Sequence, residues 1–389
     1  MDVLKDQIRL RHGAVLDSPI VQPPMLTYSG KKGGFASEET LAYYGARSQS
    51  AGMVITEFHY VSENGGPCSP LGFPEQLGIQ DDDHIASIQA IAKAIKKDGS
   101  KAILQIHHGG YQAGARAAQG KEVLAVSELD VDFLPYPVRE MTNEEIEEII
   151  KDFGRATKRA IQAGFDGVEI HGANHYLIQQ FFSKTSNRRQ DKWGASLEKR
   201  MTFALEVVKE VKEVIAKEAP TDFILGYRIS PEEIYGSTVG YTYKESLALV
   251  SQLAKEDFDY ISLSIWGGYA SKPVGSEKSY GQLFKEVVGP ETKIMLVGSV
   301  FTEDQARDAI EHHTDLIGVG RGTLIDPQFA LKIKENRGQD IVQTISPEQV
   351  AKTGWTRGLR EQFTKADAGG LPPLPGQDSI LSLHQGLFD

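Results

Sequence analysis

Short apolar runs rich in β-branched residues recur along the chain, each followed by a polar or glycine-rich turn and then by a stretch with helical periodicity. The runs lie at residues 21–26, 53–58, 102–107, 167–171, 223–229, 260–265, 293–297 and 315–319. Most are nearly continuous in Val, Ile, Leu and Phe, as in parallel strands that are covered on both faces. The pattern therefore predicts eight parallel strands alternating with helices.

Several helix starts are marked by a threonine that stands three positions ahead of Glu or Gln. The pairs are Thr142 with Glu145, Thr242 with Glu245 and Thr302 with Gln305. In such a pair the two side chains reciprocally satisfy free backbone amides at the start of a helix. From Ser196 onward, apolar residues recur at three- and four-residue intervals with Glu and Lys between them. This stripe predicts an amphipathic helix packed on a sheet.

Eight strands alternating with helices, joined by right-handed crossovers, predict a (β/α)8 TIM barrel of the α/β class. We expect one domain over residues 1–389, with an N-terminal hairpin cap at residues 1–18 and a C-terminal extension at residues 335–389. A doubly wound sheet is the competing fold. It is disfavoured because Gly318-Val-Gly320 is followed by Thr323, where the dinucleotide-binding fingerprint has its third glycine.

Composition and charge narrow the classes of function. The chain has 389 residues, of which 40% are hydrophobic and 24% charged, the balance of a soluble globular protein. No apolar run approaches the roughly 18 residues of a membrane-spanning helix, and the N-terminus has no apolar signal region, so we expect a cytoplasmic protein without a membrane partner. A formal charge of −11 disfavours nucleic acid as a partner. Cys68 is the single cysteine, which excludes a Cys-rich zinc site. The adjacent His107 and His108 would point to opposite faces of a strand, so we expect no metal.

In a TIM barrel the active site lies at the C-terminal ends of the strands, so the polar residues there are the candidates. Gln105, His171 and Arg228 lie near the ends of the third, fourth and fifth predicted strands. Glycines follow the seventh and eighth strands, at Gly298-Ser299 and Gly320-Arg321. Exposed amides beside one guanidinium are typical of a barrel phosphate site, although the same glycines would also suit tight turns.

The segment from His171 to Tyr176 concentrates donors and acids. His171 and Asn174 are hydrogen-bond donors three positions apart, which one helical turn would bring onto the same face, where they could hold one oxygen atom. Tyr176 adds a phenol with an unperturbed pKa of about 10, which is protonated at neutral pH and able to act as an acid. A histidine at a strand end is also often structural, so these residues alone leave the function open.

These residues resemble the old yellow enzyme family of FMN-dependent ene-reductases and NAD(P)H:flavin oxidoreductases. The resemblance covers nearly the whole chain, from Pro24-Met25 through Arg228-Ile229-Ser230 to Val319-Gly320-Arg321, and residues 171–200 are its most specific part. It implies FMN, tightly but non-covalently bound across the barrel mouth, with NADH or NADPH as the reductant.

The resemblance also implies a role for each candidate residue. Gln105 would reach the pyrimidine edge of the flavin, and Arg228 would lie beside N1 and the C2 carbonyl. His171 and Asn174 would hold the activating oxygen of an alkene while flavin N5 passes hydride to its β-carbon and Tyr176 protonates the α-carbon. His171 is also implied as an FMN contact, together with Pro24, Met25, Leu26 and Phe58 near the ring and Gly298, Ser299, Gly320 and Arg321 at the phosphate. Tyr28 would touch the substrate.

The chain departs from the family at three positions. Leu26 stands where the family usually has Thr or Cys, which donates towards the flavin C4 carbonyl. Thr27 could replace that donor only if a bulge turned its side chain, so we expect a lower flavin potential and slower reduction by the nicotinamide. Phe58 stands at a position that is small in many relatives and would narrow the substrate space. His175 stands where glycine is common.

Several alternatives stay open. The small-molecule acceptor could be an activated alkene such as an enone, a quinone, a nitro compound or free flavin, since all of these fit the same pair of donors. A non-redox barrel acting on a sugar phosphate would leave Gln105 and Arg228 without an evident use. An FMN barrel acting on nucleic acid would need a basic surface. The family's C-terminal arginine implies that Arg357 could reach a neighbouring subunit, so a homo-oligomer is possible.

Overall fold

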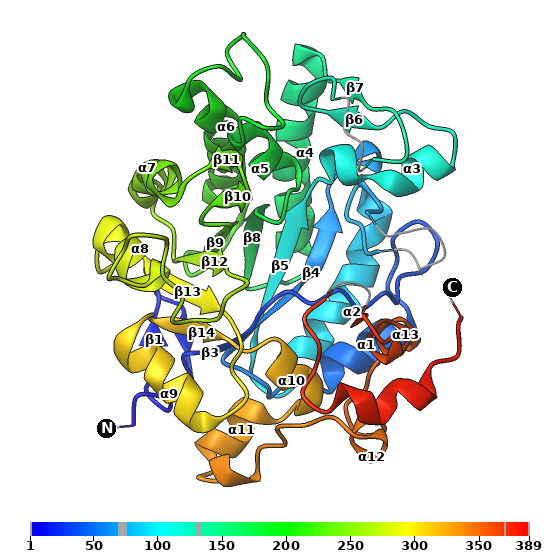
Figure 1. Ribbon diagram of the computed structural model, residues 1–389, viewed down its shortest axis with the longest axis vertical. Coiled ribbons are helices and arrows are strands. Elements are labelled where there is room, and N and C mark those ends of the chain that lie inside the picture. Colours follow the sequence, from blue (N-terminus) through cyan, green and yellow to red (C-terminus); the bar gives the residue numbers. More distant parts are fainter. Residues whose placement is uncertain (1, 69–75, 130–133, 369–370, 388–389) are drawn as a thin grey trace.

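Eight parallel strands close into a barrel at the centre of the molecule (Figure 1). The computed structural model describes residues 2–68, 76–129, 134–368 and 371–387. The strands of the barrel follow one another in chain order, and the first pairs with the last. They are β3 (Ile20–Gln22), β4 (Met53–Tyr60), β5 (Lys101–His107), β8 (Gly167–Gly172), β9 (Ile224–Ile229), β12 (Tyr260–Ser264), β13 (Lys293–Val297) and β14 (Leu316–Gly318). The predicted TIM barrel is therefore confirmed, and the doubly wound sheet is excluded.

The observed strands differ from the prediction mainly where they end. β3 ends at Gln22 rather than at residue 26, because Pro23 and Pro24 have no N–H to donate to a neighbouring strand. β4 continues to Tyr60, and its register with β5 shifts between Ile55 and Phe58. After this shift Phe58 pairs with Gln105. Both departures occur at the end of the barrel where the predicted site lies.

Helices cover the outside of the barrel. Thr142 precedes α4 (Asn143–Gln162) and Thr242 precedes α7 (Tyr243–Leu253), and each forms the predicted capping box with the Glu three residues later. Thr302 precedes α9 (Glu303–His312) and accepts from the amide of Gln305, but the Gln305 side chain accepts from the amide of Phe301 instead of that of Thr302. The other outer helices are α1 (Glu38–Gly45), α2 (Ile85–Lys96), α6 (Leu197–Glu218), α8 (Tyr280–Val288), α10 (Arg321–Ile325) and α11 (Phe329–Lys334).

The N-terminal hairpin plugs the N-terminal end of the barrel. β1 (Ile8–Arg9) and β2 (Val15–Leu16) pair antiparallel, as predicted, and Gly13 takes a φ of +97° in the turn between them. Leu10, Ala14 and Leu16 are buried in one apolar cluster with inward-facing strand residues that include Met53. Because apolar side chains fill this end, a ligand must enter from the opposite end of the barrel.

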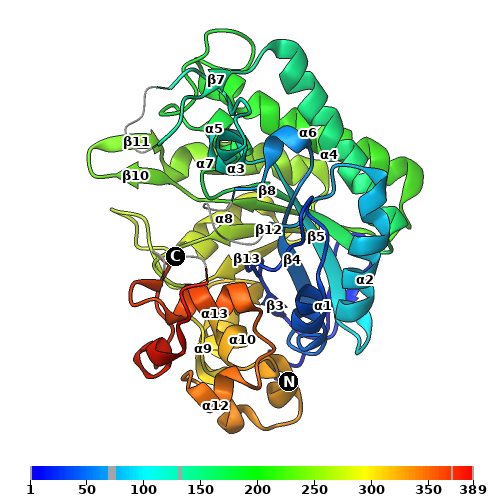
Figure 2. The ribbon, with the colours of Figure 1, turned by 90° about the vertical axis from the view of Figure 1, so that its right-hand side faces the viewer.

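Loops and short elements surround that open end. The loop after β5 contains α3 (Gly114–Ala118), β6 (Leu124–Ala125) and β7 (Arg139–Glu140), and α5 (Leu177–Phe182) follows β8. β10 (Glu233–Tyr235) and β11 (Thr238–Tyr241) form a hairpin after β9. In Figure 2 this hairpin and α13 (Arg357–Thr364) project on the same side of the barrel. No helix in the described ranges is long and apolar enough to span a bilayer.

The C-terminal extension packs beside the open end, on the segment that follows β3. It contains α12 (Pro347–Val350), α13 and a short 3-10 helix (Gln377–Leu383). Gly358 of α13 lies so close to Tyr28 that a Cβ at position 358 would overlap the Tyr28 backbone and Cβ. Thr356 Oγ1 donates to the carbonyl of Thr27. The extension thus holds in place a stretch that has no strand partners of its own.

Candidate active site

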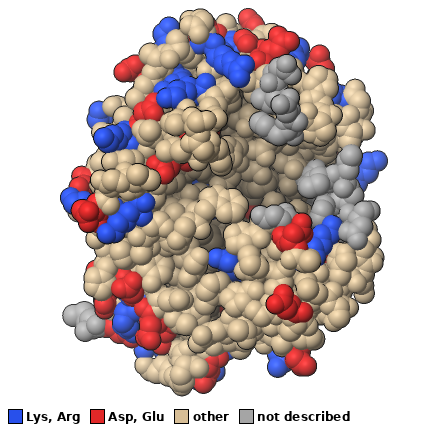
Figure 3. Space-filling model, in the orientation of Figure 1, with Lys and Arg blue, Asp and Glu red and all other residues tan. Residues whose placement is uncertain are grey.

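The residues that the sequence analysis assigned to a site lie around one cavity at the open end of the barrel. This mouth cavity has a volume of about 390 Å³, within the range of small-molecule sites. Figure 3 shows the same face as Figure 1, with a hollowed middle in which few charged side chains lie. The assigned residues in the wall are Pro24, Met25, Leu26, Tyr28, Phe58, Gln105, His171, Asn174, Tyr176, Arg228, Gly298, Ser299, Gly320 and Arg321.

Buried polar side chains from adjacent strands line the mouth cavity. Gln105 Nε2 donates to Glu169 Oε1 at 2.6 Å, and Arg228 Nη2 donates to Ser264 Oγ at 3.2 Å. Gln105 Oε1 and the Nε and Nη1 atoms of Arg228 are buried and have no hydrogen-bond partner among the described residues. Since buried polar groups are nearly always hydrogen-bonded, these atoms indicate a ligand whose edge carries both donors and acceptors.

His171 and Asn174 bring two nitrogen atoms together in the wall. Asn174 Nδ2 lies 3.4 Å from His171 Nε2. Ser264 orients the amide, because its Oγ donates to Asn174 Oδ1 at 2.8 Å. Burial, together with the charge of Arg228, lowers the pKa of His171 to about 3, so its imidazole is neutral at physiological pH. In the tautomer protonated at Nε2, the two groups can donate to one oxygen atom.

The turn that carries this pair is not helical, which corrects the expectation of a single helical turn. Asn174 has a φ of +56° and His175 a φ of +62°, both in the left-handed region that is rare for residues other than glycine. The carbonyl of His175 accepts from Gln112 Nε2 at 2.7 Å and from Gln180 Nε2 at 2.6 Å, and its ring contacts the hydroxyl of Tyr235. These bonds stabilise a histidine where glycine would be less strained.

Tyr176 lies just before α5, with its ring among other aromatic side chains. Its centroid is 5.1 Å from that of His171, 4.9 Å from that of Phe58 and 4.8 Å from that of His107. Burial raises the pKa of the Tyr176 phenol well above its usual value, so the hydroxyl keeps its proton at neutral pH. Phe58 occupies part of the wall beside this hydroxyl-bearing ring.

A cradle suited to an anionic group lies at the ends of β13 and β14. Arg321 Nη2 donates to Ser299 Oγ at 2.9 Å, and its Nη1 donates to the carbonyl of Pro373 at 2.8 Å. Gly298 approaches the next loop closely, since a Cβ there would lie 2.8 Å from the backbone of Gly268. Guanidinium groups and loop amides are the groups that bind phosphate, so these positions stay the candidate phosphate site.

The adjacent histidines at the end of β5 lie in different surroundings. His107 packs against Phe58, with ring centroids 4.1 Å apart. His108 Nε2 lies 2.9 Å from Asn64 Oδ1, and its Nδ1 accepts from the amide of Gly110. Within the part of the chain that the structure describes, no group of three or more His, Cys, Asp or Glu could hold a metal ion.

Glu57 is a wall residue that the sequence analysis missed. It is only 1% exposed, and it accepts from Thr27 Oγ1 at 2.6 Å and from the Thr27 amide at 3.3 Å. Burial raises the pKa of Glu57 to about 7. Because the hydroxyl of Thr27 is engaged by Glu57 and the residue does not line the mouth cavity, Thr27 does not replace the donor that Leu26 lacks.

The C-terminal extension supplies a second set of wall residues that the sequence analysis did not foresee. Leu359 and Phe363 come from α13, and Leu371 and Pro372 follow it. The sequence of residues 368–376 is rich in Gly and Pro and has no helical periodicity. Residues 369–370 lie outside the described residues, and 371–376 contain no helix. The sequence could not assign these apolar side chains to the cavity, because they lie far along the chain from the other wall residues and follow no pattern that indicates a site.

The buried carboxylate of Glu57 is expected to make the protein less stable as the pH rises towards 7. Its pKa is about 7 in the folded chain, against an ordinary value of 4.5. The folded state therefore binds more protons than the unfolded state between these values, so the free energy of unfolding falls across this window and stays reduced above it. The loss is on the order of 3 kcal/mol.

Glu57→Gln removes this titration, so its melting temperature should change less between pH 5 and pH 8 than that of the wild type. Glu291→Gln, at an exposed position, is the control with the same chemical change. Equal pH profiles for Glu57→Gln and the wild type would contradict the assignment.

Comparison with known proteins places these observations in a family. Residues 8–340 match the model of the NADH:flavin oxidoreductase / NADH oxidase family. A probable NADH-dependent flavin oxidoreductase of Bacillus subtilis, YqiG, is 39% identical over 344 residues, which cover 88% of this chain and 90% of that protein. NADH:acrylate oxidoreductase of Vibrio harveyi is 40% identical over 340 residues, and NADH:fumarate oxidoreductase of Klebsiella pneumoniae is 37% identical over 332. The matches cover 85% and 83% of this chain but only 33% and 35% of those two proteins.

Solved structures agree on the fold. Morphinone reductase in complex with tetrahydroNAD has a TM-score of 0.75 at 23% identity, covering 91% of this chain and 96% of that one. The old yellow enzyme homologue from Zymomonas mobilis has a TM-score of 0.74 at 22% identity, covering 91% and 99%. At this level of sequence identity, the similarity shows only that the barrel fold is shared.

Proposed function

The chain belongs to the NADH:flavin oxidoreductase / NADH oxidase family, the old yellow enzyme family, and is an FMN-dependent oxidoreductase driven by NADH or NADPH; from this premise we propose that it reduces the C=C bond of an activated alkene. The observation that carries the proposal is the mouth cavity itself. It combines unpartnered polar atoms for a flavin, a pair of donors for a substrate oxygen and a protonated phenol.

The residues of the mouth cavity fit FMN. The free Gln105 Oε1 can accept from the pyrimidine N–H of the flavin, and the free Nε and Nη1 of Arg228 can donate to its N1 and C2 carbonyl edge. The cradle of Gly298, Ser299, Gly320 and Arg321 would hold the phosphate, and Pro24, Met25, Leu26 and Phe58 would pack near the ring. Bound FMN supplies the two-electron chemistry, accepting hydride from the nicotinamide and passing it to the alkene.

Arg228 and the donor pair provide the electrostatic part of the reaction. With FMN bound, the buried guanidinium of Arg228 would stabilise negative charge on the pyrimidine edge of the flavin, in a site where little water competes. His171 and Asn174 would hold the carbonyl or carboxyl oxygen of the alkene and stabilise the charge that develops there as its β-carbon receives hydride.

Tyr176 completes the reaction by moving a proton. Its hydroxyl keeps that proton at neutral pH, and its ring lies beside His171, so the phenol would protonate the α-carbon of an alkene held by the donor pair. Tyr28, also in the wall, would touch the substrate. Two relatives that match this chain over 33% and 35% of their own length are named for acrylate and fumarate, which are alkenes conjugated to carboxylates, and this supports an activated alkene as the acceptor.

The test is the visible absorption spectrum of the purified protein, followed without oxygen after NADH or NADPH is added and again after cyclohexenone or acrylate is added. Flavin bands that bleach with the nicotinamide and return with the alkene are expected. Bleaching without return would indicate another acceptor. A protein that stays colourless after incubation with FMN would contradict the flavoenzyme assignment and favour a non-redox, phosphate-binding barrel.

Leu26→Thr is expected to raise the midpoint potential of bound FMN. Leu26 lines the mouth cavity without a donor, and Thr27 is engaged elsewhere. A new hydrogen bond to a charged group contributes about 1.5 kcal/mol, which corresponds to about 30 mV for two electrons. Leu26→Val, which matches threonine in shape but lacks the hydroxyl, is the control. Equal potentials for the two variants in a redox titration would contradict the prediction.

A further inference from the structure

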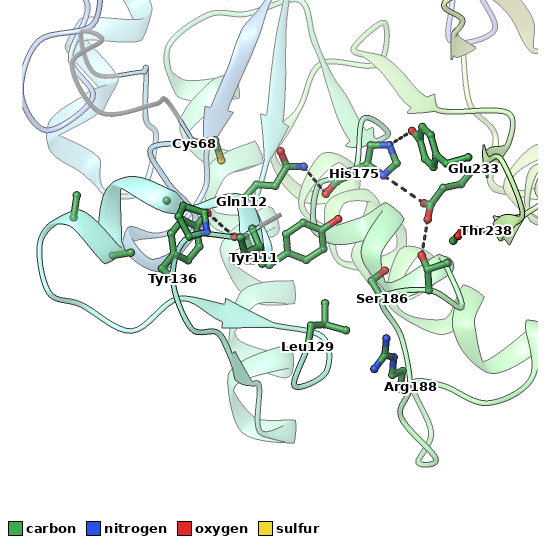
Figure 4. Close-up of a pocket in the computed structure, with 17 residues that line it drawn as sticks. Cys68, Tyr111, Gln112, Leu129, Tyr136, His175, Ser186, Arg188, Glu233 and Thr238 are labelled. Atoms are coloured by element: carbon green, nitrogen blue, oxygen red, sulfur yellow. Dashed lines mark hydrogen bonds and ion pairs between the residues drawn. The ribbon is translucent and has the colours of Figure 1, made fainter. Parts of the chain in front are cut away.

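We propose that a second cavity, beside the catalytic turn, binds the adenosine diphosphate half of the nicotinamide coenzyme. This outer cavity has a volume of about 1150 Å³ and lies between the loop that follows β5 and the β10–β11 hairpin (Figure 4). Its lining includes Gln112, Tyr136, His175, Arg188, Glu233 and Tyr235. The inference rests on the proposed function, because it concerns the reductant of the same reaction.

The coenzyme needs a binding surface outside the mouth cavity. Direct hydride transfer requires the nicotinamide ring to lie against the flavin, so that ring must enter the mouth cavity. The mouth cavity measures about 390 Å³, which leaves no room for a second nucleotide beside the flavin. The N-terminal end of the barrel is plugged by the hairpin, and Thr323 interrupts the dinucleotide-binding fingerprint. The adenosine half must therefore lie on the open face of the barrel.

The outer cavity begins where the mouth cavity ends. His175 lines the outer cavity, whereas its neighbours Asn174 and Tyr176 line the mouth cavity. Gln112, also in the outer lining, donates to the carbonyls of Asn174 at 3.3 Å and His175 at 2.7 Å. This turn therefore borders both spaces, and a nicotinamide amide held by His171 and Asn174 would have the outer cavity on the other side of it.

The outer cavity offers the groups that a nucleoside diphosphate requires. The exposed guanidinium of Arg188 makes no hydrogen bond or ion pair with any described residue, although its backbone amide donates to Ser127. Figure 4 shows Arg188 on one side of the cavity and Tyr136 on the other. Arginine binds phosphate oxygens in a bidentate manner. The rings of Tyr136 and of Tyr235, which is 60% exposed, provide surfaces on which a purine can stack.

The charges of the lining favour NADH over NADPH. Arg188 is the only Lys or Arg among the residues described in this lining. Although Glu233 is buried, hydrogen bonds from His175, Thr185, Gln179 and Ser183 lower its pKa to about 2, so it stays charged. One guanidinium can bind a pyrophosphate in a bidentate manner and offset one of its two negative charges, but a further 2′-phosphate would meet no second cation among the described lining residues and would approach a fixed carboxylate.

A second route by which the adenosine half could leave the mouth cavity runs past Trp266, a wall residue that is 73% exposed. The described wall of the mouth cavity contains two arginines: Arg228 lies buried at the end of β9, and Arg321 is held by Ser299 and Pro373 in the phosphate cradle. The free charge of Arg188 and the larger volume of the outer cavity therefore favour the route past His175.

The test compares two reductants of the FMN-loaded full chain by anaerobic stopped-flow absorption. NADH carries the adenosine half, whereas 1-benzyl-1,4-dihydronicotinamide carries the ring alone. Arg188→Gln should raise the Kd for NADH by about tenfold to a hundredfold, as expected for one lost charged hydrogen bond, and leave the reaction with the benzyl compound unchanged. Calorimetry with ADP-ribose supplies a readout independent of turnover: its Kd should rise in the variant by a similar factor. Lys184→Gln, at an exposed neighbour outside the lining, is the matched control.

Ala118→Trp provides a steric test, because residue 118 lies in the lining and is exposed on α3. It should weaken NADH and ADP-ribose binding without affecting the benzyl compound. The inference would be overturned if Arg188→Gln left the Kd for NADH unchanged, or if it weakened only the binding of the alkene. It would also be overturned if Trp266→Ala weakened NADH binding while Arg188→Gln did not. If neither reductant bleached the wild type, the proposed function itself would fail.

Discussion

Tyr176→Phe should slow reduction of the alkene by a factor of about 10² to 10⁴, the usual contribution of a positioned general acid. The phenyl ring can keep its packing against Phe58 and His171, so the loss is that of a proton donor and not of structure. Reduction of FMN by the nicotinamide needs no proton from Tyr176 and should stay nearly unchanged. Stopped-flow absorption measures the two half-reactions separately, through the bleaching and the return of the flavin bands.

Tyr28→Phe is the matched control, because Tyr28 is the other tyrosine described in the wall of the mouth cavity. Burial, with a contribution from the charge of Glu57, raises the pKa of Tyr28 to about 12. Both phenols are therefore protonated at neutral pH, and the comparison depends on position alone. If Tyr28→Phe stopped alkene reduction while Tyr176→Phe did not, the acid would be Tyr28. Full turnover in both variants would mean that the proton comes from solvent.

His171→Ala is expected to lower the rate of alkene reduction by about 10² to 10³, the cost of removing one donor from an oxyanion site. It should also weaken binding of the alkene and of the nicotinamide, because both would use the same donor pair. Asn174 alone would remain, held by Ser264 at 2.8 Å. Saturation kinetics of each half-reaction measure both effects.

His171→Asn keeps a donor at this position and should recover part of the rate. Because the pKa of His171 is about 3, its charge does not change between pH 5 and pH 8. A plot of the wild-type rate against pH should therefore contain no break between pH 5 and pH 8 that disappears in His171→Asn. Such a break would mean that the imidazole is protonated in the working enzyme and that its assignment as a neutral donor is wrong.

The architecture was readable from the sequence because the strand signal is local. Apolar β-branched runs such as Lys293–Val297 coincide with the observed strands, and the capping boxes at Thr142 and Thr242 form as predicted. The predicted strand boundaries are wrong where contacts between distant segments or steric effects decide where strand pairing ends. The β3 run continues in apolar character past Gln22, but Pro23 and Pro24 prevent pairing with a neighbour.

The sequence predicted residues that the structure brings to one cavity, but not all of their geometry. His171 and Asn174 come together through a left-handed turn and not through a helical one, a conformation that tertiary hydrogen bonds to His175 impose. Glu57 reads as one polar position within a strand, and only the closed barrel shows that Thr27 is its partner. The wall formed by Leu359 and Phe363 depends on how α13 packs on Tyr28, a contact between segments far apart in the sequence.

The contribution of the C-terminal extension to the wall has a consequence for biosynthesis. The barrel can close only when β14 pairs with β3, and Leu371 and Pro372 of the cavity wall follow β14 by about fifty residues. During translation, the flavin site therefore stays incomplete until well after the eighth strand has left the ribosome. The wall of the cofactor site is therefore completed only after all the strands that close the barrel have been synthesised.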